Sequence, residues 1–137
     1  MPKAPLIAIV DDDDDMREAL SDLLLVLGLS NRAYDRAEAL LAEYEPGAID
    51  CVITDVRMPG MSGLELLGLL RRIDGAVPVI VITSDTSPET RMQALEGGAH
   101  AFMTKPVEDD VLLGHLRSAL GLDLSVGAGG RKRDPDE

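Results

Sequence analysis

The sequence predicts an α/β fold, a doubly wound parallel sheet of five strands covered by helices on both faces. Short apolar runs of strand length alternate with segments whose apolar residues follow helical spacing. The strongest runs are continuously apolar, which is typical of parallel strands buried on both faces. Strict alternation of the two kinds of segment favours a parallel sheet with helices on both sides.

The first half of the chain supplies five of the expected elements. Residues 6–10, "LIAIV", form a short apolar run that is typical of a buried strand. Apolar positions then recur at helical spacing over residues 16–29, where a glycine supplies a C-terminal stop. Residues 31–35 predict a weak strand, residues 36–45 a short helix before Pro-Gly, and residues 49–55, "IDCVITD", a strong strand.

The second half continues the alternation. The serine of the loop "MPGMSG" can cap a helix over residues 63–73. Residues 77–83, "VPVIVIT", predict a strand, and residues 87–98 a helix opened by Ser-Pro and stopped by Gly-Gly. A last short strand, "AFMT", and a last helix follow over residues 101–104 and 108–121.

Composition and charge exclude several classes of protein. The chain has 25 acidic and 13 basic residues, for a formal net charge of −12, so it will not bind nucleic acid through its overall field. No apolar stretch approaches the ~20 residues that span a bilayer. Asp11 ends the first apolar run too early for a signal peptide. We therefore expect a cytoplasmic protein with no membrane contact and no direct nucleic-acid contact.

Residues 1–121 are expected to form one domain, and residues 122–137 a flexible tail or linker. The tail is rich in glycine and then in charged residues, with an Arg-Lys-Arg triplet that we interpret as solvated. No output domain follows, so the chain is either a stand-alone domain or a piece cut from a longer protein. Cys51, the only cysteine, lies in an apolar run and is expected to be a small buried hydrophobe.

Polar side chains follow the predicted strand ends: Asp11, Asp12, Asp55, Thr83, Ser84 and Lys105. In open parallel sheets, ligands bind beyond the carboxyl ends of the strands, so these side chains should gather at one edge. Two carboxylates about 5 Å apart repel by about 3 kcal/mol at an effective dielectric constant of about 20. Three carboxylates therefore need a cation, and oxygen ligands in an incomplete shell favour Mg²⁺.

A carboxylate beside Mg²⁺, with a lysine and a threonine opposite, suits phosphoryl transfer. Asp55 is the best candidate for the nucleophile because it stands alone at the end of a central strand and precedes the Pro59–Gly60 turn. An aspartate nucleophile would form an acyl phosphate.

These motifs resemble the receiver domain of two-component response regulators over residues 6 to about 120, and the FixJ-like type in particular. The matching pieces are "VDD" (10–12), "DVRMPGMSGLELL" (55–67), "VITS" (81–84) and "KP" (105–106). The resemblance implies a flavodoxin-like three-layer α/β/α sandwich with strand order 2-1-3-4-5. It also implies a signalling domain that assists its own phosphorylation and dephosphorylation, and not a turnover enzyme.

The resemblance also implies a phosphorylation site and a metal site. Asp55 would accept a phosphoryl group from a sensor histidine kinase or a phosphotransfer protein. Mg²⁺, or Mn²⁺ in its place, would be held by Asp11, Asp12, Asp55 and the backbone carbonyl of Arg57. Of the first two aspartates, Asp12 is expected to be the direct ligand.

Four further positions correspond to the switch of this family. Thr83 would hydrogen-bond the phosphoryl group, Lys105 would pair with it, and the small side chain of Ser84 would leave access to it. Phe102 would be the switch aromatic, although its position suits a plain core residue equally well. The Lys105–Pro106 bond would be cis.

Signalling would run through the fourth helix, the fifth strand and the fifth helix, to a partner or an output domain, and this face would also serve a homodimer. The switch position carries phenylalanine, so a tyrosine hydroxyl has no role there. Asp85 adds a carboxylate beside the expected pocket, and we hypothesise that it alters the lifetime of the phosphoryl group.

Three alternative functions place different demands on the sequence. A phosphatase with an aspartate nucleophile needs a second aspartate two positions later, where this chain has Arg57. A calcium-binding loop starting at Asp11 would place Met16 where glycine is needed, and is rejected. An adaptor that keeps the fold without phosphorylation remains open, although all the key residues are present.

The run of five aspartates, Asp11 to Asp15, is expected to divide by role. The first two face the metal, Asp13 lies in a loop, and Asp14 or Asp15 caps the first helix, with Glu18 at capping-box spacing from Asp15.

Overall fold

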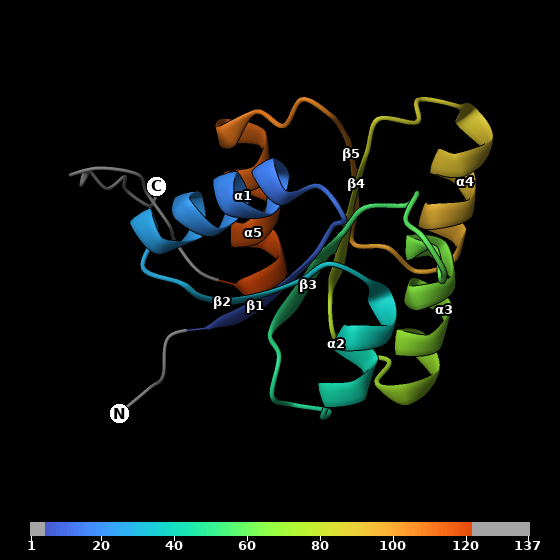
Figure 1. The fold of residues 1–137 in the computed structure, drawn as a ribbon, viewed down its shortest axis with the longest axis horizontal. Coiled ribbons are helices and arrows are strands. Elements are labelled where there is room, and N and C mark those ends of the chain that lie inside the picture. Colours follow the sequence, from blue (N-terminus) through green and yellow to red (C-terminus); the bar gives the residue numbers. More distant parts are fainter. Residues whose placement is uncertain (1–4, 122–137) are drawn as a thin grey trace, which may run out of the picture.

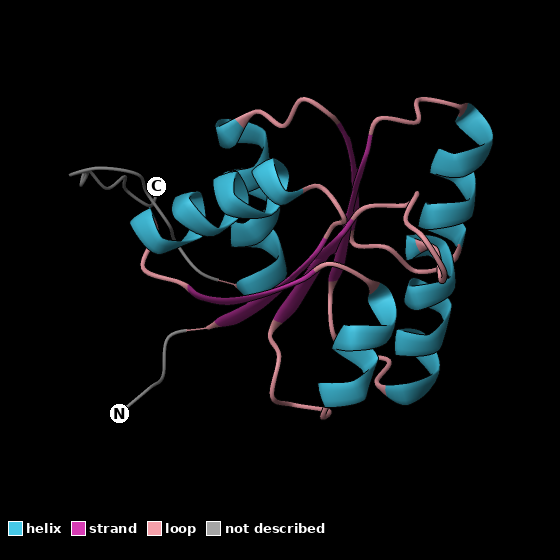
Figure 2. Cartoon of the chain, viewed as in Figure 1, coloured by secondary structure: helices cyan, strands magenta, loops and turns pink. Residues whose placement is uncertain are grey.

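The structure, a computed structural model, describes residues 5–121, in which strands and helices alternate strictly (Figures 1 and 2). The predicted tail, residues 122–137, lies outside the described residues. The elements are β1 (Leu6–Val10), α1 (Asp14–Val26), β2 (Ser30–Tyr34), α2 (Ala37–Glu43), β3 (Cys51–Thr54), α3 (Gly63–Ile73), β4 (Val79–Thr83), α4 (Pro88–Glu96), β5 (Ala101–Thr104) and α5 (Asp109–Leu120).

The five strands form one parallel sheet in the order β2-β1-β3-β4-β5, which confirms the expected topology. The strand order reverses beside β1, and this is where open α/β sheets form a ligand crevice. The register pairs Val10 of β1 with Thr54 of β3. Because both strands end at this pair, the residues that follow, Asp11 and Asp55, lie next to each other.

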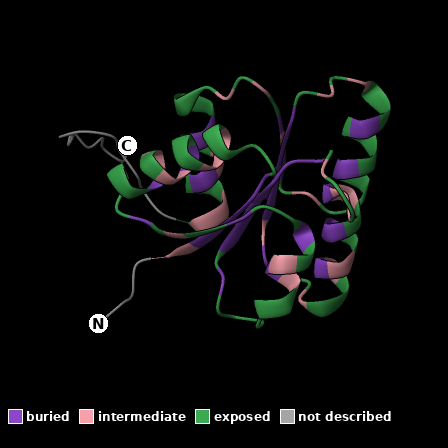
Figure 3. Cartoon of the chain, in the orientation of Figure 1, coloured by how far each residue is buried: buried purple, intermediate pink, exposed green. Residues whose placement is uncertain are grey.

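Helices cover both faces of the sheet (Figure 1), with α1 and α5 on one face and α2, α3 and α4 on the other. Successive strand side chains point to opposite faces. Ile7 and Ile9 therefore pack with α1 and α5, while Ala8 and Val10 pack with the other three helices. The strands form the buried centre of the molecule (Figure 3). Cys51 is fully buried there, as expected, and burial raises the pKa of its thiol to about 12.

Helix starts follow capping chemistry, with one correction to the sequence-based prediction. Ser62 and Glu65 form a capping box at α3, and Ser87 caps α4. At α1 the cap is Asp13, whereas the sequence pointed to Asp14 or Asp15. Asp13 Oδ1 accepts hydrogen bonds from two backbone N–H groups of the first turn, so the helix begins directly after it.

None of the helices in residues 5–121 is both long enough and apolar enough to cross a lipid bilayer.

Candidate phosphorylation and metal site

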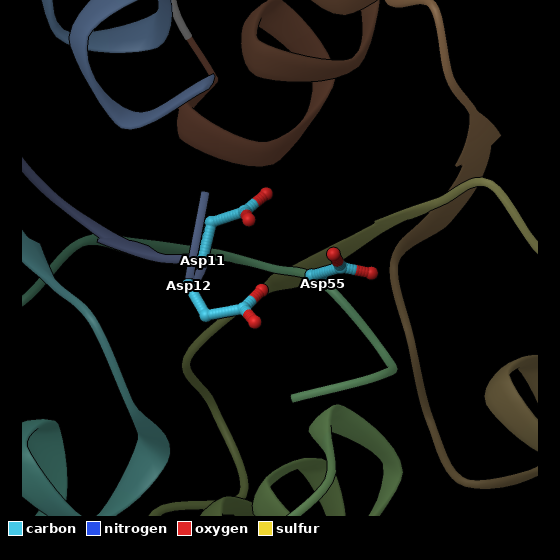
Figure 4. Close-up of side chains that lie close together, drawn as sticks. All are labelled: Asp11, Asp12 and Asp55. Atoms are coloured by element: carbon cyan, nitrogen blue, oxygen red, sulfur yellow. The ribbon is translucent and has the colours of Figure 1, made fainter. Parts of the chain in front are cut away.

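The predicted carboxylates come together at the C-terminal edge of the sheet. Asp11, Asp12 and Asp55, hereafter the acidic cluster, each offer a carboxylate oxygen, and these oxygens lie within 4.8 Å of one another. Figure 4 shows the three side chains leaving the neighbouring ends of β1 and β3. Asp11 and Asp55 are buried, whereas Asp12 is exposed and so has the most open approach for an ion.

Asp55 is held by both its backbone and its side chain. Its N–H donates to the carbonyl of Val10 at 3.0 Å, which continues the pairing of β1 and β3 beyond the strand ends. Its Oδ1 accepts from the Val56 N–H at 2.6 Å, and its Oδ2 accepts from Lys105 Nζ at 2.9 Å. The carboxylate orientation is therefore set before any ligand binds.

Lys105 joins the acidic cluster from the end of β5. Its ammonium group lies 2.9 Å from Asp55 Oδ2 and 3.0 Å from Asp11 Oδ2. Burial opposes its positive charge, but its hydrogen bonds to the two carboxylates and their charges outweigh burial and raise the pKa of Lys105. The lysine is therefore charged at neutral pH and relieves part of the repulsion among the carboxylates.

Asp11 is the most deeply buried carboxylate of the acidic cluster. Burial raises the pKa of Asp11, against the opposing effects of the Asp13 N–H and of Lys105. The Asp13 N–H donates to Asp11 Oδ1 at 2.9 Å, and Arg17 Nη1 donates to the Asp11 carbonyl at 2.6 Å. A cation beside Asp11 would favour its ionised form.

The donor set of the acidic cluster fits a hard divalent cation. All its ligand atoms are carboxylate oxygens, which suit Mg²⁺. Three ionised carboxylates and one ammonium leave two negative charges, so a divalent ion would balance the local charge. The role expected for the Arg57 carbonyl stays a prediction.

The other predicted residues lie along the ends of β4 and β5. Thr83 is buried at the end of β4, and its carbonyl accepts from the Lys105 N–H at 2.9 Å. Ser84 follows and is exposed. Phe102 is half-buried in β5 and packs against the core on the α2, α3 and α4 face. The Lys105–Pro106 peptide bond is cis, as expected.

Two neighbours of Asp55 were not singled out from the sequence. Thr54 Oγ1 donates to the Asp55 carbonyl at 2.8 Å. Gly63, the first residue of α3, lies so close that a Cβ atom there would be 1.9 Å from the same carbonyl oxygen. The glycine therefore allows α3 to start directly against the Asp55 backbone. Gly63 lies within the motif "DVRMPGMSGLELL", which was the available signal in the sequence. The motif alone does not explain why a glycine is needed at this position.

The ion pair between Arg57 and Asp85 was also not predicted from the sequence. Arg57 Nη2 donates to Asp85 Oδ2 at 2.7 Å, linking the loop after β3 to the loop after β4. The sequence placed both residues at the same edge of the sheet, but not in contact. The hypothesis that Asp85 alters the lifetime of a phosphoryl group stays a prediction.

Sequence comparison connects this arrangement to known proteins. The family model of the response regulator receiver domain matches residues 7–117. The response regulator protein TodT of Pseudomonas putida is 38% identical over 120 residues, covering 88% of this chain and 53% of TodT. The transcriptional regulatory protein FixJ of Azorhizobium caulinodans is 37% identical over 127 residues, covering 93% of this chain and 60% of FixJ. The chain thus spans little more than half the length of these relatives.

Solved structures show the same fold. The BeF3-activated DrrB receiver domain superposes with a TM-score of 0.81 at 28% identity, covering 88% of this chain and all of that one. A response regulator receiver protein from Pseudomonas putida superposes with a TM-score of 0.77 at 32% identity, covering 86% of this chain and 99% of that one.

Proposed function

The chain belongs to the response regulator receiver family of two-component signalling domains, and we propose that it accepts a phosphoryl group on Asp55 from a sensor histidine kinase or a phosphotransfer protein. The acidic cluster with Lys105 at its side is the observation that carries this proposal. It combines an oriented carboxylate nucleophile with a place for a divalent ion and a fixed positive charge.

In the proposed reaction, a carboxylate oxygen of Asp55 attacks the phosphorus atom. A new oxygen–phosphorus bond forms, and the bond from phosphorus to the donor's imidazole nitrogen breaks. Carboxylates are ionised near neutral pH, so no separate general base is needed. Mg²⁺ or Mn²⁺ held by Asp11, Asp12, Asp55 and the Arg57 carbonyl would neutralise charge on the phosphoryl oxygens. Lys105, already in contact with Asp55 Oδ2, would bind a phosphoryl oxygen, and the Thr83 hydroxyl another.

The signal would leave through α4, β5 and α5. A phosphoryl group adds about two negative charges and several acceptors, and it stabilises whichever conformer brings Thr83 and Lys105 closer to it. Phe102 would move with Thr83. This face carries the exposed side chains of Met92, Leu95 and Val111, which supports a partner, an output domain or a homodimer as its occupant.

We extend this proposal to the whole chain. Residues 1–121 form the receiver domain, which acts in the cytoplasm, makes no direct contact with nucleic acid and assists its own phosphorylation and dephosphorylation. Residues 122–137 form a linker or tail. The family match over residues 7–117 and the formal charge of −12 support this assignment.

The central test is incubation with acetyl phosphate and Mg²⁺, followed by intact mass spectrometry. We expect one added phosphoryl group on the wild type and none on Asp55→Asn, which keeps the shape of the side chain but loses its charge. An unmodified wild type, or a modified Asp55→Asn, would contradict the proposal.

A second test separates two neighbouring aspartates. Asp12→Ala should weaken Mg²⁺ binding roughly tenfold or more, because even groups that only support a ligand contribute 10- to 100-fold. Asp13→Ala should leave Mg²⁺ affinity within about twofold but lower the free energy of unfolding by about 1 kcal/mol, because Asp13 caps α1. Calorimetric titration with Mg²⁺ and urea unfolding measure the two effects. Equal Mg²⁺ affinities of the two variants would remove Asp12 from the proposed site.

A further inference from the structure

Asp85 forms hydrogen bonds with three separate parts of the molecule. Its Oδ2 accepts from Arg57 Nη2 at 2.7 Å and from Thr90 Oγ1 at 2.8 Å. Its Oδ1 accepts from the Ser87 N–H at 2.9 Å, and its own N–H donates to Thr83 Oγ1 at 3.1 Å. One residue therefore touches the loop after Asp55, the first turn of α4 and the hydroxyl group at the end of β4.

The ion pair between Arg57 and Asp85 is half covered. The Asp85 side chain is 11% exposed, whereas the Arg57 side chain is 75% exposed. The Ser87 N–H, then Arg57 and Thr90, hold the pKa of Asp85 well below its ordinary value. The carboxylate is therefore ionised at neutral pH and can pair with the Arg57 guanidinium.

The contact with α4 lies in the first turn of that helix, next to the Ser87 cap. Thr90 and Ala94 are the buried residues of α4, and Thr90 is the one whose hydroxyl donates to Asp85. Met92 and Leu95 on the same helix are exposed. Asp85 thus links the first turn of α4 to the loop after β3 through Arg57.

The contact with Thr83 has a directional consequence. A hydroxyl group has one proton to donate and two lone pairs that accept. Because the Asp85 N–H uses a lone pair, the Thr83 proton stays free to donate to another acceptor. The same residue that ties α4 thereby helps to orient the hydroxyl group that would bind a phosphoryl oxygen.

We propose that Asp85 is a positioning residue that couples the loop after Asp55 to α4, with the Arg57–Asp85 ion pair as the link. This inference rests on the proposed function, because the phosphoryl group on Asp55 is the event to be transmitted. A change in the loop that carries Arg57 reaches Asp85 directly, and Asp85 passes it to Ser87 and Thr90. This route is separate from movement of the Thr83 side chain itself.

The test measures amide hydrogen exchange in peptides covering residues 86–96, with and without acetyl phosphate and Mg²⁺. Intact mass reports the phosphorylated fraction in each sample.

The variants are Asp85→Asn, Arg57→Gln, Arg57→Lys and the double variant with Asn at 85 and Gln at 57. Asparagine at 85 keeps one oxygen that can accept from the Ser87 N–H. It loses the charge that attracts Arg57 and the second oxygen, which accepts from Thr90, so Arg57→Gln is the variant that removes the ion pair alone. Arg32→Gln is the matched control, because Arg32 forms an exposed ion pair with Glu43 away from the acidic cluster.

In the wild type, phosphorylation should change the exchange rate of these peptides. Removing a partly exposed ion pair should reduce that change roughly two- to fivefold in Asp85→Asn and in Arg57→Gln. The double variant should show no further loss, because both substitutions remove the same link. Arg57→Lys should keep at least half of the response, and Arg32→Gln all of it.

Three results would overturn the inference. A full response in Arg57→Gln would show that the ion pair transmits nothing. An altered exchange rate in Asp85→Asn alone, equal with and without phosphorylation, would reduce Asp85 to a cap of α4. A phosphorylated wild type whose α4 does not respond would leave nothing to couple. In each of these cases the added mass still supports the proposed function, whereas absence of the added mass from the wild type would overturn both proposals.

Discussion

Helices α3 and α4 lie side by side on the same face of the sheet (Figure 1), yet they are held in different ways. Helix α3 begins with a complete capping box and buries four residues, Gly63, Leu66, Leu67 and Leu70. Helix α4 begins with a single serine cap and buries only Thr90 and Ala94. Apolar burial secures α3, whereas hydrogen bonds at the first turn secure α4.

This difference matches the position of each helix relative to Asp55. Helix α3 starts against the Asp55 backbone, so it helps to fix the position of the proposed nucleophile. Helix α4 follows the loop of Thr83 and Asp85, so, under the proposed function, its smaller buried surface would let a change at the acidic cluster alter its position. Regions of low local stability are the ones available for switching.

The largest effect should come from truncating a buried leucine of α3. Leu70 is fully buried, and Leu70→Ala should lower the free energy of unfolding by about 2–5 kcal/mol, through lost burial and the cavity left behind. Leu95 of α4 is 42% exposed, and Leu95→Ala should lower it by less than about 1 kcal/mol. Urea unfolding followed by circular dichroism measures both. Equal losses of unfolding free energy in the two variants would contradict the difference between the helices described above.

A smaller effect should come from two glycines within α3. Gly63→Ala would push a Cβ atom against the Asp55 carbonyl, so we expect a loss of about 1–3 kcal/mol in unfolding free energy and slower phosphorylation by acetyl phosphate. Gly68 faces open space in the same helix, so Gly68→Ala should raise stability by about 0.5–1 kcal/mol. If Gly63→Ala left both the unfolding free energy and the phosphorylation rate unchanged, the close approach of α3 to Asp55 would matter for neither.

The smallest effect should come from lowering the pH, which should destabilise α4 before it destabilises α3. The pKa of Asp85 is lowered in the folded protein, so its contribution to stability is present above its unfolded pKa and is lost as pH falls toward the folded pKa. As pH falls below about 4, the protection of amides in residues 88–96, measured against their intrinsic exchange rates, should decrease, while the buried leucines of α3 are indifferent to pH. Asp85→Asn should show a weaker dependence on pH. An identical pH profile in the variant would remove Asp85 as the cause.

Most of the fold could be predicted because it depends on local and periodic features. The segments 6–10, 63–73 and 101–104 match β1, α3 and β5 as predicted, and the other elements differ at their ends by a few residues. The prediction of the α1 cap was wrong because three consecutive aspartates, Asp13 to Asp15, offer the same capping chemistry. Only the backbone path decides that Asp13 has the right geometry to bond the N–H groups of Asp15 and Met16.

Three features could be predicted from the sequence alone: the alternation of elements, the family, and the gathering of four side chains at one edge of the sheet, Asp11, Asp12, Asp55 and Lys105. These follow from apolar periodicity and from strand ends, which are encoded locally. Three contacts became visible only in the folded chain: Lys105 bridges Asp11 and Asp55, Gly63 lies against the Asp55 carbonyl, and Arg57 pairs with Asp85. Each of these contacts joins side chains or backbone from separate loops. Their directions depend on how neighbouring strands and helices pack, and that packing is not a property of any short stretch of the chain.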